Sequence, residues 1–182
     1  MRTVLKGGTM IAPVPAVIVT CSHENITNAF TVAWTGIINT RPPMTYISVR
    51  PERFSYDIIK NSGEFVINLT TSKMAKITDY CGMKSGKKTD KMKRLETVPS
   101  SQVDAPTLSA SPVALECKVR ELKELGSHTM FMADIVAVTA DERYIDSKGK
   151  INLEQAGLMA YAHGKYYSLG RKLGDFGFSV RK

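Results

Sequence analysis

The alternation of apolar and polar residues along the chain predicts mostly short β-strands. Residues 16–20 form a continuous apolar run, AVIVT, which is typical of a strand buried on both faces. Residues 27–38 are rich in Thr, Val, Ile and aromatic side chains, and the glycine inside this stretch suggests a bulge or a close backbone approach. Further strands are expected over residues 44–50, 64–69, 114–125, 129–140 and 158–161.

Helical spacing marks two short stretches, residues 55–61 and 72–81, and the basic loop over residues 84–94 is expected to run into a short helix. Ser55 fits an N-cap, and the glycines at 63 and 82 are expected to end the two helices. Residues 99–112 are expected to cross the surface, and residues 126–128 to form a hairpin turn. Many antiparallel strands with few short helices predict a mainly β fold, a β-barrel with helical decoration.

The charge of the chain is unevenly distributed. Lys and Arg outnumber Asp and Glu by 25 to 17, a net charge of +8, which suggests a nucleic-acid or membrane surface or a site for a small phosphorylated ligand. Residues 84–94 contain six cations and one anion. Such a stretch is either a solvated loop or an anion clamp. It contains no aromatic residue, which argues against single-stranded nucleic acid.

Several classes of protein are excluded by what the sequence lacks. No apolar run is long enough to span a bilayer, and prolines interrupt the only segment that resembles a leader. Cys21, Cys81 and Cys117 are far apart, so neither a disulfide scaffold nor a zinc site is expected, and a cytoplasmic location is predicted. Residues 82–89 resemble a P-loop, but their spacing is wrong. We expect no metal site and no catalytic nucleophile or triad.

Two further segments have residues suited to ligand binding. Arg50 and Ser55 lie where a strand gives way to a helix, and a helix start with a hydroxyl and a guanidinium suits a phosphate. The alternative is a simple capped turn. Trp34 and Gly36 lie in a strand along which a flat ligand would fit, although a core strand has the same pattern.

Together these segments resemble the flavin reductase-like proteins of the FMN-binding split-barrel superfamily. The resemblance covers roughly residues 10–170, the expected core of a single domain of residues 1–182 with a C-terminal tail over 171–182. The stretches that carry it are NAFTVAWTG (28–36), RPPM (41–44), ISVRP (47–51), SYDII (55–59), SGEFVINL (62–69), TDK (89–91) and GSHT (126–129).

The resemblance implies a homodimer that binds FMN non-covalently near the subunit interface. Matching positions assign one side of the flavin ring to Trp34, Thr35, Gly36 and Ile37, with Asn28 at the start of that segment. The same matching assigns the phosphate to Arg50, Ser55, Tyr56 and Lys91, and the vicinity of the ring to His128 and Tyr161. At two positions the family often has an acidic residue where this chain has Arg41 and Ser127. The resemblance implies that these differences would alter the partner side of the flavin.

These implications make an FMN-dependent oxidoreductase the leading hypothesis. It would take a hydride from NAD(P)H and pass electrons to free flavin, a ferric complex or a partner protein. The alternative within the same fold is an electron carrier that reacts poorly with NAD(P)H, because no pyridine-nucleotide motif is visible. A basic nucleic-acid-binding barrel is the alternative from another class. We expect neither nucleic acid nor a membrane as a partner.

Overall fold

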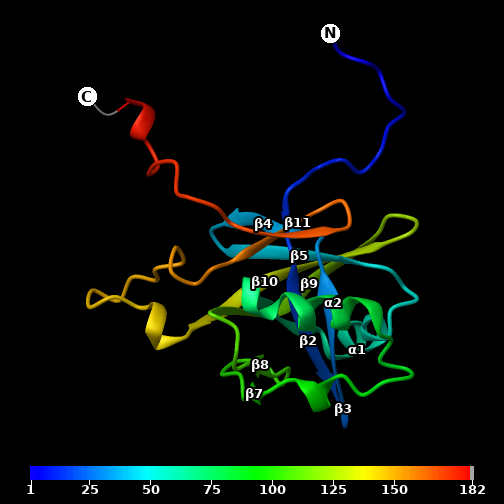
Figure 1. Cartoon of the computed structure of the whole chain (residues 1–182). Helices are drawn as coiled ribbons and strands as arrows, with labels where there is room; N and C mark the ends of the chain where they lie inside the picture. Colours follow the sequence, from blue (N-terminus) through cyan, green and yellow to red (C-terminus); the bar gives the residue numbers. More distant parts are fainter. Residues whose placement is uncertain (181–182) are drawn as a thin grey trace.

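The computed structural model describes residues 1–180 and is built around one strongly curved antiparallel sheet (Figure 1). Its seven strands lie in the order β3-β2-β6-β9-β10-β5-β4. Their bounds are β2 Val17–His23, β3 Ile26–Val32, β4 Thr35–Thr40, β5 Pro43–Val49, β6 Glu64–Leu69, β9 Val113–Glu124 and β10 Thr129–Ala140. The predicted mainly β class is confirmed.

Smaller elements decorate this sheet. Strands β1 (Val14–Pro15), β11 (Met159–Ala162) and β12 (Lys165–Ser168) form a three-stranded sheet, and β7 (Thr97–Val98) pairs with β8 (Thr107–Leu108). The helices are α1 (Ser55–Ser62) and α2 (Ala75–Met83), and the short 3-10 turns are η1 (Ser72–Met74), η2 (Met92–Arg94), η3 (Glu142–Tyr144) and η4 (Phe178–Val180). Both helices pack against β2 and β3.

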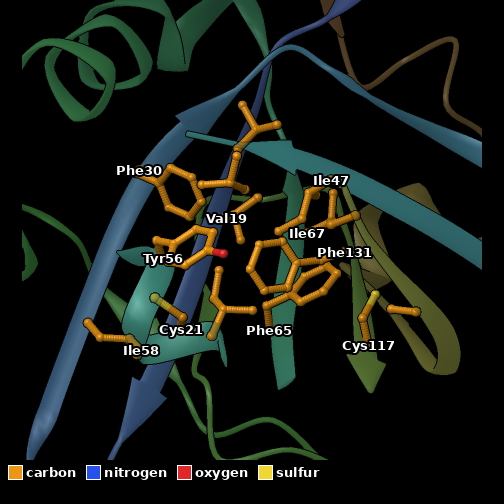
Figure 2. Close-up of a cluster of buried hydrophobic side chains, with 14 of the residues drawn as sticks. Val19, Cys21, Phe30, Ile47, Tyr56, Ile58, Phe65, Ile67, Cys117 and Phe131 are labelled. Carbon is orange, nitrogen blue, oxygen red and sulfur yellow. The ribbon is translucent and has the colours of Figure 1, made fainter. Parts of the chain in front are cut away.

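The main core lies inside the curved sheet, where inward side chains of most of its strands meet α1. Phe65, Phe131 and Ile47 are fully buried there, and Tyr56 of α1 meets Phe131 edge to face at 5.3 Å between ring centroids (Figure 2). Strand β2 is buried on both faces over residues 17–21, as its continuous apolar sequence predicts. The sheet therefore supplies a rigid wall against which α1 and α2 are fixed.

The single strand predicted over residues 27–38 is wrong, and the error explains the closure of the barrel. The stretch forms β3 and β4, which lie at opposite edges of the sheet and are separated only by Ala33 and Trp34. Two residues can join opposite edges only if the sheet curls until those edges approach each other. The backbone N–H of Ser48 in β5 donates to the carbonyl of Trp34 at 2.9 Å and holds this crossing in place.

Two predicted helix signals need correction. Ser55 is the first residue of α1 and caps nothing, because its hydroxyl accepts a hydrogen bond from the Asn28 amide at 2.7 Å. Gly82 does not end α2, which continues to Met83. A Cβ on Gly82 would lie 3.3 Å from the Thr31 side chain, so this glycine allows the helix to pack closely on β3. Gly63 ends α1 with a φ of 71°, as predicted.

The segment predicted to cross the surface, residues 99–112, is partly buried. Val103, Ala105 and Leu108 pack inward, and residues 107–108 form β8. Glu116 of β9 holds this segment against the sheet, because its fully buried carboxylate accepts hydrogen bonds from the backbone N–H groups of Ser101 and Gln102. The second strand of the C-terminal hairpin, β12, had no clear sequence signal. No helix within residues 1–180 is long and apolar enough to cross a membrane.

Candidate functional site

Two neighbouring cavities lie between the sheet, α2 and the loop that follows α2. The first, the ring cavity, has a volume of about 450 Å³, and the second, the anion cavity, about 520 Å³. Phe30, Arg50 and Arg53 line both of them. Volumes of this size are typical of sites for small molecules. The shared residues indicate that one elongated ligand can occupy both cavities.

The anion cavity is strongly positive. Arg50, Arg53, Lys84 and Lys91 line it, against the single carboxylate of Glu52. Arg53 is held in position because its guanidinium donates to the carbonyl of Gly82 at 3.0 Å. Cations converging on a partly enclosed space, with hydroxyl and amide groups beside them, are suited to a phosphate.

Lys91 is the most unusual residue of this cavity. Its side chain is 2% exposed, and its ammonium donates to one acceptor, the carbonyl of Cys81, at 3.2 Å. No carboxylate within residues 1–180 forms an ion pair with it. Burial lowers the pKa of Lys91, and the nearby thiols of Cys81 and Cys21 oppose that shift. The ammonium has three N–H donors, and the carbonyl of Cys81 accepts from one of them. An anion in the cavity would accept from the others and would balance the buried charge.

The remaining wall of the anion cavity is a close contact between three segments. Asn28 of β3 donates to Ser55 at the start of α1, so both polar groups are fixed at the cavity. Gly86 packs directly against them, and a Cβ there would lie 2.2 Å from Phe54 and 2.7 Å from the Asn28 side chain. Only glycine permits this approach, which brings the backbone of the basic loop to the cavity.

Aromatic side chains surround the ring cavity. Trp34 lies against His128, with ring centroids 4.5 Å apart, and Tyr161 lies against Tyr166 at 5.3 Å. The Tyr166 hydroxyl donates to Asp79 of α2 at 3.3 Å, which fastens the β11–β12 hairpin to the helix. Burial, reinforced by Asp79, raises the pKa of Tyr166 to about 12, so this tyrosine stays protonated. The cavity is therefore a slot with π-faces at its border.

The surroundings of His128 favour its neutral form. Partial burial lowers its pKa from the ordinary value of 6.5, and Arg50 lowers it further. Its Nδ1 forms a hydrogen bond of 3.0 Å with the Ser127 hydroxyl. The positive charge near the ring cavity thus comes from Arg50 and Arg53 and not from the imidazole.

The three cysteines are free, buried and unreactive in character. Burial raises the pKa of Cys21 to about 12, and it also raises the pKa of Cys81 and Cys117. Cys81 lines the anion cavity, but a protonated buried thiol is a poor nucleophile. No cluster of His, Cys, Asp or Glu suited to a metal ion occurs among residues 1–180.

The structure brings together seven of the eleven residues named from the sequence. Asn28, Ser55 and Lys91 line the anion cavity, Trp34, His128 and Tyr161 line the ring cavity, and Arg50 lines both. The other four lie outside the two linings. Thr35, Gly36 and Ile37 form the start of the edge strand β4, where Ile37 is 63% exposed. Tyr56 is in the core, with its hydroxyl 3.1 Å from that of Thr129.

Sequence reasoning missed several residues that line the cavities. They are Phe30, Arg53, Asp79, Met83, Ser85 and Tyr166. Arg53 had a signal, because it follows Arg50 by three residues at the same helix start. Ser85 and Gly86 belong to the glycine-containing basic stretch that was considered as a P-loop. Asp79 and Tyr166 had no signal in the sequence, because they are 87 positions apart and only the tertiary fold brings them together.

The chain belongs to the family described as "Flavin reductase like domain", whose model matches residues 10–170. It is similar over 99% of its length, and 99% of the other chain, to the structure of flavoredoxin from Desulfovibrio vulgaris (Miyazaki F), with a TM-score of 0.90 and 29% identity. An FMN-binding protein from Thermus thermophilus shares the fold, with a TM-score of 0.83 and 21% identity over 96% of this chain and 99% of that one. An uncharacterised protein of Pyrococcus abyssi is 27% identical over 82% of this chain and 87% of its own length.

Proposed function

We propose that this protein binds FMN and acts as an oxidoreductase that takes a hydride from NAD(P)H and passes electrons on. One observation carries the proposal. Lys91 presents a buried ammonium with a single acceptor to a positive cavity, and that cavity continues into a slot bordered by aromatic rings. FMN has a phosphate at one end, which matches the anion cavity, and a flat ring at the other, which matches the ring cavity. The Thermus thermophilus structure of the same fold is described as an FMN-binding protein.

The residues of the two cavities fit FMN in distinct roles. Arg50, Arg53 and Lys91 would hold the phosphate, with Ser55 and Asn28 as polar neighbours. Trp34, His128 and Tyr161 would flank the ring. A bound flavin supplies the redox chemistry, and the protein positions it, tunes it and controls access. Arg50 and Arg53 place positive charge where the two cavities meet, which favours the more negative, reduced form of a ligand spanning them.

The absorbance spectrum of the purified protein tests this proposal. We expect a yellow protein, or a colourless one that takes up FMN stoichiometrically and quenches its fluorescence. Addition of NADH or NADPH under anaerobic conditions should then bleach the flavin band, and excess FMN should be turned over. A colourless protein that takes up no FMN would contradict the proposal.

A second candidate function is an electron carrier with little intrinsic NAD(P)H activity. It is favoured by the 29% identity to flavoredoxin across the whole chain and by the absence of a pyridine-nucleotide motif in the sequence. Stopped-flow mixing of the FMN-loaded protein with NADH separates the two functions. Fast bleaching supports the reductase, and bleaching that takes many minutes supports the carrier.

We also propose that the protein is a homodimer with a single domain in each chain. The terminal segments extend away from the sheet (Figure 1) and expose apolar side chains. Val4, Leu5 and Ile11 are exposed in the first segment, and Leu169, Leu173 and Phe178 in the last. A second copy of the chain would cover such surface, which water solvates poorly.

A further inference from the structure

The loop after α2 carries an exposed group of cations, most of which lie outside the lining of the proposed flavin site. We call Lys84, Lys87, Lys88 and Lys93 the lysine patch; all four side chains are exposed. Within the described part of the chain, none of them forms an ion pair. One phosphate is matched by the buried Lys91 together with Arg50 and Arg53, so the positive charge of the patch exceeds what a single mononucleotide needs.

The loop geometry holds this charge in one place. The carbonyl of Ser85 accepts hydrogen bonds of 3.1 Å from the backbone N–H groups of both Lys88 and Thr89, which forms a tight turn. Gly86 anchors the turn against Phe54 and Asn28. Lys87 and Lys88 lie on this turn, directly after Ser85 and Gly86, which line the anion cavity together with Lys84. Lys87 also lines a separate cavity, together with Glu24 and Asp57. The backbone that carries Lys87 and Lys88 is thus held in one conformation.

An exposed apolar side chain adjoins the patch at the mouth of the ring cavity. Met83 lines that cavity, is 76% exposed, and directly precedes Lys84. Methionine is enriched in protein interfaces, and charges around an apolar centre are typical of small transient contacts. Nucleic acid is a poorer match, because residues 84–94 contain no aromatic side chain on which a base would stack.

We propose that an acidic protein bearing a one-electron redox centre near its surface docks on the lysine patch around Met83. This inference rests on the proposed flavin function, because the docked surface covers the mouth of the ring cavity. Each docking event transfers one electron to the partner. Two successive partner molecules accept the two electrons of the reduced flavin, and the accompanying protons leave to water.

Binding is tested first, without turnover. The probe is oxidised plant plastocyanin, a small acidic blue-copper protein, labelled for fluorescence anisotropy and mixed with the oxidised, FMN-loaded protein. We expect its affinity to fall about tenfold or more between roughly 20 mM and 300 mM salt, because the attraction is screened. Affinity that does not change with salt would overturn the proposal.

A matched pair of charge-reversal variants locates the surface. Lys87→Glu/Lys88→Glu should weaken plastocyanin binding about tenfold at low salt while FMN affinity stays within about twofold. Lys148→Glu/Lys150→Glu makes the same charge change on the exposed link between β10 and β11, and should leave plastocyanin binding nearly unchanged. Equal losses in both variants would show that only net charge matters and would overturn a defined docking surface.

Electron transfer is the second readout. The flavin is reduced with a stoichiometric amount of dithionite and mixed anaerobically with oxidised plastocyanin or with basic mitochondrial cytochrome c. The rate to plastocyanin should fall with salt and in Lys87→Glu/Lys88→Glu, whereas the rate to cytochrome c should rise in both cases. An oligonucleotide that displaces plastocyanin and binds more tightly would instead identify a nucleic-acid surface. Failure of the protein to take up FMN would refute the flavin function, and plastocyanin anisotropy with the FMN-free protein would still report on docking.

Discussion

Lys91 differs from the other lysines of its loop because its ammonium is buried. Its neighbours Lys88 and Lys93 are exposed and solvated, so losing one of them costs a ligand little. Removing Lys91 instead removes the only fully buried cation of the anion cavity. The sequence pattern TDK at 89–91 marks this residue, but only its burial distinguishes it physically from five other cations in the same stretch.

The first prediction concerns FMN affinity. Lys91→Met keeps the length and packing of the side chain and removes the charge, so it should weaken FMN binding by about 1–3 kcal/mol through lost charge-assisted hydrogen bonds. Quenching of FMN fluorescence measures this affinity. Lys93→Met is the matched control and should change it by less than about twofold. Equal affinities for Lys91→Met and the unmodified protein would mean that the phosphate lies elsewhere.

The second prediction concerns pH. Burial lowers the pKa of Lys91 below its ordinary value of 10.5 when no anion is present. A bound phosphate favours the charged ammonium and raises that pKa, so binding takes up a proton at pH values between the two. FMN affinity should therefore fall as the pH rises through the window between the lowered pKa of the free protein and the higher pKa of the complex.

Titrations of FMN at a series of pH values, in buffers of different ionisation enthalpy, measure this proton uptake. In Lys91→Met the proton uptake assigned to Lys91 should disappear. A pH dependence that is the same in both proteins would assign the titration to another group.

At the scale of elements, buried polar groups fix loops that have no regular structure of their own. Glu116 lies on a strand whose alternation predicts one apolar face with Leu115, Cys117 and Val119. On the opposite face Glu116 is nevertheless buried, whereas Lys118 and Arg120 further along that face are exposed. The reason is the segment of residues 99–112, which folds over β9 and offers backbone N–H groups to the carboxylate. A local pattern cannot reveal this cover, because the covering segment comes from elsewhere in the chain.

Glu116 therefore provides the third prediction. Glu116→Ala leaves the N–H groups of Ser101 and Gln102 without their acceptor, and should lower the free energy of unfolding by about 2–4 kcal/mol. Denaturation with urea measures this loss. Glu121→Ala, on an exposed position of the same strand, should change it by less than about 0.5 kcal/mol. A similar stability of the two variants would show that the carboxylate does not hold the segment.

At the scale of the whole molecule, the terminal segments and the lysine patch concern partners. The fourth prediction is that the protein has twice the chain mass of 20.1 kDa in solution by light scattering. Removal of residues 1–9 together with 171–182 should shift it towards the monomer, because exposed apolar side chains such as Val4, Leu5 and Leu173 are lost. A protein that is already monomeric at micromolar concentration would contradict the homodimer.

The sequence by itself determined the mainly β class, the two helices to within a few residues, the family and most of the candidate site. Strand alternation and helical spacing are local properties, and each of the motifs at 28–36, 47–59 and 89–91 is a short continuous stretch of the chain. Only the tertiary structure decided that residues 27–38 divide between opposite edges of the sheet, that the β11–β12 hairpin places Tyr166 against Asp79 of α2, and that Trp34 lies against His128. It also decided which lysine is buried, because burial depends on segments distant in sequence packing over the same point.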